Sequence, residues 1–190
     1  MHIYPHWNWH TGDTVDIVGY YNQADEVELF LNGNSLGRRS KTGEELHVKW
    51  RVPYAPGSLK AVSRKNGKTV LTTEIKTADA PYQLKASADR INIKADGPDL
   101  SYITVEITDK NGVVVPIADD LVNFSVSGAG TIVGLDNGNP VDLESFKGLQ
   151  HKAMNGKLIC IIQSNGKKGP ITIHAASNDL KPVTISLKAE

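Results

Sequence analysis

The chain has 190 residues with 21 basic and 21 acidic side chains, so its formal net charge is zero. A zero net charge disfavours nucleic-acid and anionic-membrane binders, because both need a basic surface to neutralise phosphates. The 39% hydrophobic content excludes a disordered chain, no apolar run approaches the roughly 18 residues of a membrane helix, and the lone Cys160 excludes a disulfide framework or a multi-cysteine zinc site.

The first ten residues are unusually aromatic for a chain terminus. Tyr4, Trp7 and Trp9 lie there, whereas free termini are usually small and polar. No basic stretch followed by an apolar stretch is present, so we expect no secretory signal. The expectation is either a cytoplasmic protein or an internal piece of a longer chain, with something missing upstream.

Between the turns of the first half, apolar residues recur with the period of two that β-strands require. Leu46, Val48, Trp50 and Val52 alternate with charged or polar residues, so we expect all four to point inward. Val, Ile and Thr are abundant throughout, and these side chains favour strands. The pattern predicts strands at residues 14–20, 26–31, 35–39, 45–52, 58–64 and 69–76, with a weaker one before Trp9.

A domain boundary is predicted near residues 76–81. This stretch is small and polar, ends in Pro81 and follows the last strand of the first half. The predicted domains are residues 1–78 and 79–190.

The second half has the same organisation. Asn-Gly is the strongest short hairpin signal, and it occurs in the chain at Asn32, Asn66, Asn111, Asn137, Asn155 and Asn165. The run 158–162 is continuously apolar, which is typical of a central strand buried on both faces. We expect strands at 83–88, 92–95, 101–108, 122–127, 131–135, 157–163, 170–176 and 183–187. The fold class is therefore all-β, with two tandem immunoglobulin-like β-sandwich domains.

The N-terminal aromatic segment is the first candidate site. Tyr4, His6, Trp7 and Trp9 could stack on sugar rings or anchor one domain on another, and we favour the interface. His2, His6 and His10 are spaced four apart, which suits a metal site only on a helix. Pro5 argues against a helix here, so no metal site is expected.

An oxygen-rich loop in the second half is a weak calcium candidate, with Asp136, Asn137, Asn139 and Asp142 as potential ligands. The alternative, which we favour, is a turn in which these side chains cap their own backbone. No catalytic carboxylate pair is expected: Glu26 and Glu28 share one strand face, read as solvated. Cys160 is expected to be buried and inert.

Two segments resemble a known family. Tyr4-Pro5-His6-Trp7-Asn8-Trp9, with residues 27–37 and 50–61, is similar to the immunoglobulin-like domain that follows the catalytic barrel in bacterial β-galactosidases of glycoside hydrolase family 2. Residues 100–109, 126–130, 136–140 and 154–164 resemble a further C-terminal sandwich of these enzymes. Asn139 stands where the family usually has an acid, which weakens the calcium hypothesis.

The resemblance implies a parent enzyme that hydrolyses β-galactosides with retention, using two Glu residues of an upstream barrel that this chain does not contain. It implies a non-catalytic C-terminal fragment that packs on the barrel and shapes its substrate cleft, with no cofactor. The partners it implies are the barrel and β-galactoside glycans, with no nucleic acid and no membrane. It also implies a periplasmic or secreted parent in a bacterium.

Two further hypotheses remain open. One is a stand-alone carbohydrate-binding or adhesion module that uses Trp7 and Trp9. The other is a purely structural spacer.

Overall fold

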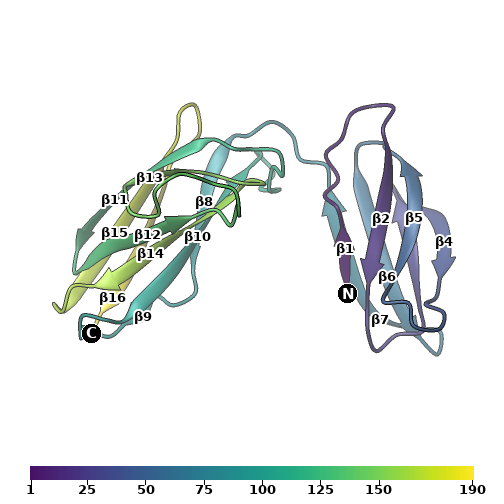
Figure 1. Ribbon diagram of the computed structural model, residues 1–190, viewed down its shortest axis with the longest axis horizontal. Coiled ribbons are helices and arrows are strands. Elements are labelled where there is room, and N and C mark those ends of the chain that lie inside the picture. The colour runs from purple at the N-terminus through teal and green to yellow at the C-terminus, as the bar shows by residue number, and fades with distance from the viewer. The chain divides into compact units, whose positions relative to one another are not determined.

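A computed structural model describes all residues, 1–190, and shows an all-β protein with two compact units, Met1–Thr77 and Ala78–Glu190 (Figure 1). The predicted fold class is confirmed. No helix is present, and so none is long and apolar enough to cross a membrane. The division assigns Ala78 to the second unit, one residue before the boundary that we expected.

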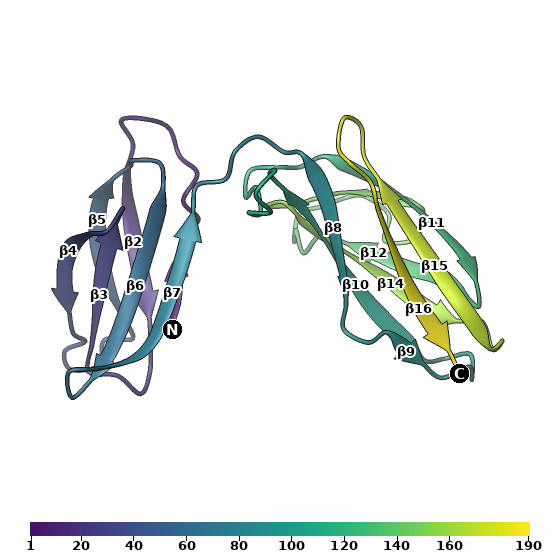
Figure 2. The same ribbon diagram turned by 180° about the vertical axis from the view of Figure 1, so that it is seen from behind.

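The first unit contains two antiparallel sheets. One has the order β1-β2-β5 and the other β4-β3-β6-β7, and Figure 2 shows the second sheet from its outer side. The strands are β1 (His2–Tyr4), β2 (Thr14–Tyr20), β3 (Glu26–Leu31), β4 (Asn34–Arg39), β5 (His47–Pro53), β6 (Ser58–Lys65) and β7 (Lys68–Lys76).

The core of the first unit lies between these sheets, and strand β5 contributes to it by strict alternation. In β5, Val48, Trp50 and Val52 are buried while the residues between them are exposed. Gly19 on the paired strand β2 leaves room for the Trp50 ring, because a Cβ there would lie 3.3 Å from it. Our expectation for Leu46 is wrong: it precedes the strand and is 76% exposed.

The second unit also contains two sheets, with the orders β12-β14-β10-β8 and β13-β11-β15-β16-β9. All pairings are antiparallel except β16 with β9. The strands are β8 (Gln83–Ala88), β9 (Asn92–Ile93), β10 (Leu100–Thr108), β11 (Leu121–Gly128), β12 (Gly130–Asp136), β13 (Gln150–Lys152), β14 (Lys157–Ser164), β15 (Gly169–Ala176) and β16 (Val183–Ala189). The short strand β13 was not predicted.

Strand β14 is central in its sheet, but it is not buried equally on both faces. Leu158, Cys160 and Ile162 are fully buried, whereas Ile159 and Ile161 on the opposite face are only half-buried. The prediction of burial on both faces is therefore wrong. One sheet face packs on the core and the other is partly open, as antiparallel sheets allow.

A buried carboxylate fixes the start of the second unit. Asp109 is 1% exposed, and its two oxygens accept backbone N–H groups from Asp79, Asn111 and Val113 at 2.8–3.0 Å. Although burial pushes the pKa of the Asp109 carboxyl upward, these backbone N–H groups hold it below its ordinary value. A side chain far along the sequence thus ties the chain after Thr77 to the second sandwich.

Candidate functional site

The aromatic segment of the first unit divides between core and surface. Trp7 is 1% exposed, packs edge-on against Tyr54 with ring centroids 5.2 Å apart, and donates its indole N–H to Ala55 O at 2.9 Å. A Trp with its body buried and its N–H satisfied belongs to the core. The expectation that Trp7 contacts a sugar or a partner is therefore wrong.

The other three candidates, Tyr4, His6 and Trp9, are accessible. Tyr4 is 60% exposed and Trp9 is 37% exposed, and the Trp9 ring stacks on the His6 ring at 4.9 Å with an interplanar angle of 17°. The Trp9 indole N–H donates to His6 O at 2.8 Å. Because this bond uses the only hydrogen-bond donor of the Trp9 side chain, the exposed part of that side chain is an apolar ring surface.

His6 supports this aromatic pair as a neutral ring. Its Nδ1 accepts the backbone N–H of Asn8 at 3.2 Å, and burial lowers the pKa of the imidazole. The segment is fixed to the unit behind it, because Thr77 donates its hydroxyl to Trp7 O at 2.8 Å. The result is a rigid, uncharged aromatic surface at Tyr4, His6 and Trp9, which we call the aromatic turn.

The spaced histidines do not form a metal site. His2 lies on β1, and His10 Nδ1 lies 3.5 Å from the carboxylate of Asp13 in a turn. His6 stacks on Trp9 instead. The three imidazoles belong to different local structures, because no helix brings them to one face.

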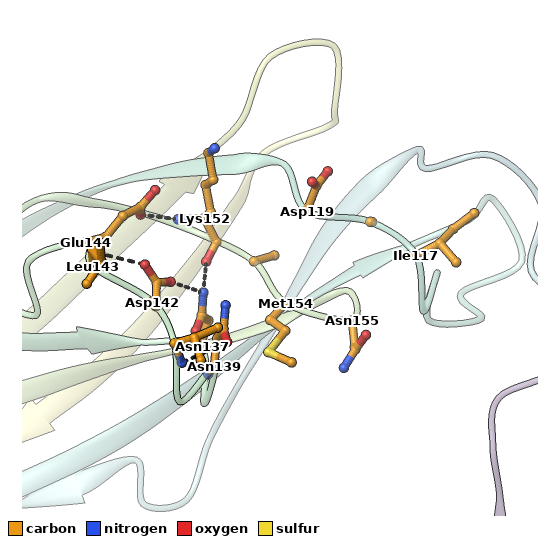
Figure 3. Close-up of a pocket in the computed structure, with 13 residues that line it drawn as sticks. Ile117, Asp119, Asn137, Asn139, Asp142, Leu143, Glu144, Lys152, Met154 and Asn155 are labelled. Atoms are coloured by element: carbon orange, nitrogen blue, oxygen red, sulfur yellow. Dashed lines mark hydrogen bonds between the residues drawn. The ribbon is translucent and has the colours of Figure 1, made fainter.

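The oxygen-rich loop of the second unit uses its oxygens on itself (Figure 3). Side-chain oxygens of Asp136, Asn137, Asn139 and Asp142 each accept a backbone N–H two residues further on, at 2.8–3.2 Å. Asn137 Nδ2 also donates to Asp142 Oδ2 at 2.7 Å and to Lys152 O at 3.1 Å. These are Asx turns, in which Asn and Asp stabilise bends of their own backbone, and they support the self-capping alternative over four converging calcium ligands.

A different group comes closest to a metal-binding arrangement. Ligand atoms of Asp142, Glu144 and His151 lie within 4.8 Å of one another. However, His151 Nδ1 lies 3.0 Å from Lys152 O, and a carbonyl can only accept, so this nitrogen carries a proton. Glu144 Oε2 accepts the Lys152 N–H at 2.9 Å. The trio as it stands holds the loop against β13. Sequence reasoning did not assign Glu144 or His151 as ligands, because His151 lies outside the oxygen-rich loop, on the unpredicted strand β13, and no motif links the two residues.

A shallow cavity of about 520 Å³ adjoins this loop (Figure 3). Asp119, Asn155 and the loop side chains give it a polar wall, and Ile117, Leu143 and Met154 give it an aliphatic one. It contains no aromatic ring, so it lacks the stacking surface with which proteins commonly hold sugars.

The acidic pair of the first unit is an ion-pair network rather than a solvated face, which corrects our reading. Glu28 Oε2 lies 2.8 Å from Arg64 Nη1, and Arg38 contacts both Glu26 and Glu28. A hydrogen bond from Ser35, and then the arginine charges, hold the pKa of Glu28 below its ordinary value. A general acid needs the opposite shift.

The expected burial of Cys160 agrees with the structure. The thiol lies in the core between the two sheets of the second unit, and burial raises its pKa to about 12. The thiolate is the reactive form, so this cysteine is unreactive near neutral pH.

Two family descriptions match the chain. Residues 84–186 match Glycoside hydrolase family 2 C-terminal domain 5, and residues 12–71 match a domain of unknown function. The two matches fall in the two structural units.

Individual relatives match over nearly the whole chain. The β-galactosidase BoGH2A of Bacteroides ovatus is 47% identical over 190 residues, which are 100% of this chain and 22% of the relative. A β-glucuronidase of Formosa agariphila is 28% identical, covering 100% of this chain and 19% of the relative. A crystal structure of a β-glycosidase from Bacteroides vulgatus superposes with a TM-score of 0.92 at 34% identity, covering 99% of this chain and 24% of the other. The chain thus spans about a fifth to a quarter of the length of these proteins.

Proposed function

Because the chain belongs to glycoside hydrolase family 2, we propose that it forms two non-catalytic C-terminal domains of a retaining β-galactosidase-like enzyme. In this proposal a catalytic barrel precedes the chain in the same polypeptide. The first unit, residues 1–78 by our boundary, follows the barrel directly, and residues 79–190 form the further C-terminal sandwich. The chain packs on the barrel and supports its substrate cleft.

The observation that carries this proposal is the extent of the match. Every residue of the chain aligns with a β-galactosidase at 47% identity, yet that alignment accounts for only 22% of the relative. The β-glucuronidase relative contains the same region at lower identity. A region that is shared by enzymes of different sugar specificity suits a supporting role. We propose galactose as the sugar that the parent enzyme cleaves, because the β-galactosidase is the more similar of these two relatives.

The aromatic turn is the surface that we assign to the barrel contact. Tyr4, His6 and Trp9 are exposed or half-exposed, uncharged and held rigidly by Trp7 behind them. Aromatic side chains with little conformational freedom are the most effective anchors of protein interfaces. Burial of Tyr4 and Trp9 against the barrel removes apolar surface from water without costing much side-chain entropy.

The test uses two purified pieces, this chain and the portion of the polypeptide before it. We expect no β-galactoside hydrolysis by this chain alone. We expect its addition to the upstream portion to raise that portion's melting temperature or its activity. Hydrolysis by the chain alone, or no effect on a folded upstream portion, would contradict the proposal.

A second function is favoured by the stacked His6–Trp9 pair. An exposed ring fixed on a rigid turn is also how carbohydrate-binding modules hold sugars, so the chain could bind β-galactoside glycans through Trp9 and Tyr4. Titration with galactose, lactose and β-glycan oligosaccharides, followed by tryptophan fluorescence, separates the two functions. A saturable fluorescence change that Trp9→Ala abolishes supports glycan binding. A flat titration of the folded chain contradicts glycan binding and favours the barrel contact as the role of the aromatic turn.

A further inference from the structure

Three turns of the chain share one sequence and one backbone conformation. Asn32-Gly33 joins β3 to β4, Asn66-Gly67 joins β6 to β7, and Asn155-Gly156 lies between the paired residues Met154 and Lys157. The Asn φ angles are 50°, 50° and 52°, and the Gly φ angles are 84°, 73° and 72°. The three turns therefore share their dipeptide and similar φ angles, and what distinguishes them is the set of contacts that each dipeptide makes.

Asn-Gly is the dipeptide in which an asparagine side-chain amide most easily loses its nitrogen as ammonia, and asparagine is a known thermolabile residue. The glycine amide nitrogen attacks the side-chain carbonyl carbon, and glycine hinders this approach least because it has no Cβ. The reaction needs a side-chain amide that can rotate toward the backbone. It also needs a glycine nitrogen that is free of other bonds.

In the first turn the side-chain amide is held. Asn32 Nδ2 donates to Pro56 O at 3.0 Å, and Asn32 Oδ1 accepts the Ser58 N–H at 2.8 Å. Rotation of this amide toward Gly33 breaks both hydrogen bonds. The electrophile is thus fixed in an unreactive position.

In the third turn the glycine nitrogen is held instead. Gly156 donates its N–H to Ala118 O at 2.9 Å and is buried. A Cβ at this position would lie 2.3 Å from Val115 O, which shows how closely the backbone is packed there. The nucleophile cannot leave this position without opening the surrounding structure.

The second turn has neither restraint. Asn66 and Gly67 are both exposed, the Asn66 side chain makes no hydrogen bond, and a Cβ on Gly67 would have no heavy atom within 4 Å. Only the backbone N–H of Asn66 is bonded, to Asp25 Oδ2 at 2.7 Å, and this group takes no part in the reaction.

We propose that Asn66 is the site of spontaneous deamidation in the folded chain. The Gly67 nitrogen loses its proton and forms a bond to the Asn66 side-chain carbonyl carbon, and the bond to Nδ2 breaks with release of ammonia. Water then opens the resulting five-membered imide, giving aspartate or isoaspartate. No electrons are transferred. The product carries a new negative charge beside Asp25, and the isoaspartate form lengthens the backbone of the turn.

Each remaining Asn-Gly site has at least one of the two restraints: Asn137 and Asn165 have a held side-chain amide, and at Asn111 the glycine nitrogen is held, because Gly112 donates its N–H to Asp109 O at 3.1 Å. Asn137 and Asn165 each use both side-chain groups, the latter on Gly128 O at 3.2 Å and on the Lys167 N–H at 3.1 Å. Asn111 has a weaker restraint, a 3.5 Å contact from its Nδ2 to Asp79.

The test is incubation of the full chain at mildly alkaline pH, followed by peptide mapping with mass spectrometry for the gain of one mass unit at each Asn-Gly. We expect Asn66 to convert at least about tenfold faster than Asn32 and Asn155, since local structure sets the rate. Conversion of Asn32 or Asn155 as fast as Asn66 in the folded chain would overturn the proposal.

Two controls separate structure from sequence. In concentrated urea we expect the three rates to converge, because the dipeptide is the same. If Asn66 stays faster in urea by the same factor, the folded environment is not the cause and the proposal fails.

An Asn66→Gln chain should form acidic isoforms at less than about half the rate of the original chain in isoelectric focusing. An unchanged rate would also overturn the proposal.

Discussion

The two candidate regions of this chain are held in place by different kinds of interaction. In the first unit the aromatic turn is anchored by Trp7, whose side chain is buried in the core. In the second unit the ordered segments depend on carboxylates: Asp109 accepts three backbone N–H groups, and Asp142 binds within its own loop. Apolar burial depends little on pH, whereas carboxylate anchors depend on their charge. The aromatic turn and the carboxylate-anchored segments therefore respond differently to mutation and to acid.

Removal of the apolar anchor has the largest expected effect. Trp7→Ala creates a cavity in the first unit and breaks the bond to Ala55 O, at a cost of about 3–5 kcal/mol. Trp9→Ala, at a half-exposed ring, is the matched control and should cost less than about 1 kcal/mol. Urea unfolding followed by tryptophan fluorescence measures both, because Trp7, Trp9 and Trp50 all lie in the first unit. Equal losses for the two variants would contradict the division into core and surface.

Removal of the carboxylate anchor comes next. Asp109→Ala removes the buried carboxylate that accepts three part-buried backbone N–H groups, so we expect the second unit to lose about 2–4 kcal/mol. Labelling of the buried Cys160 thiol during urea unfolding reports this unit. An unchanged labelling midpoint would show that Asp109 does not stabilise the second unit. An equal shift in the tryptophan transition of the first unit would show that its effect is not confined to the second unit.

The pH dependence of the same anchor is a smaller effect with a definite sign. The folded-state pKa of Asp109 is held below its unfolded value, so its contribution is present above the unfolded pKa and is lost as the pH falls through the folded pKa. Asp109→Asn should flatten this part of the stability profile of the second unit. If the stability of the second unit falls at low pH in the variant as it does in the original chain, other carboxylates cause the acid sensitivity.

The oxygen-rich loop should give the smallest effect. Asp142→Ala removes acceptors for the Glu144 N–H and for Asn137 Nδ2, but the loop keeps its other turns. We expect a smaller fall in the Cys160 labelling midpoint than for Asp109→Ala. Calcium added to the original chain should leave the midpoint unchanged, because the loop oxygens already accept backbone N–H groups. A calcium-dependent rise that Asp142→Ala abolishes would restore the metal hypothesis.

The strands were largely predictable from the sequence because alternation and turn residues agree. Most predicted strands lie within two residues of those observed, and Asn32, Asn66 and Asn155 occupy two-residue hairpin turns. Strand β13 was missed because its three residues are too few to show a period. Leu46 was wrongly predicted to point inward because the alternation of apolar and polar residues already includes Leu46, whereas the strand begins only at His47.

The candidate sites were less predictable, since identical residue types serve opposite purposes. Trp7 and Trp9 lie two residues apart, yet Trp7 is buried against Tyr54 with its indole N–H on Ala55 O, whereas Trp9 is half-exposed with its indole N–H on His6 O. Likewise the oxygens of residues 136–142 suit calcium in composition but are used by the backbone. Hydrogen-bond partners, rather than composition, decide these roles, and they come from tertiary structure.

The most direct test of the proposed barrel contact is the affinity of this chain for the catalytic portion that we propose precedes it, measured by calorimetry with matched variants. Trp9→Ala alters the aromatic turn, and Tyr102→Ala removes a ring of similar exposure, 40%, on the second unit. We expect Trp9→Ala to weaken binding by about tenfold or more and Tyr102→Ala to leave it unchanged. Equal affinity for both variants and the original chain would contradict the assignment of the aromatic turn to the barrel contact.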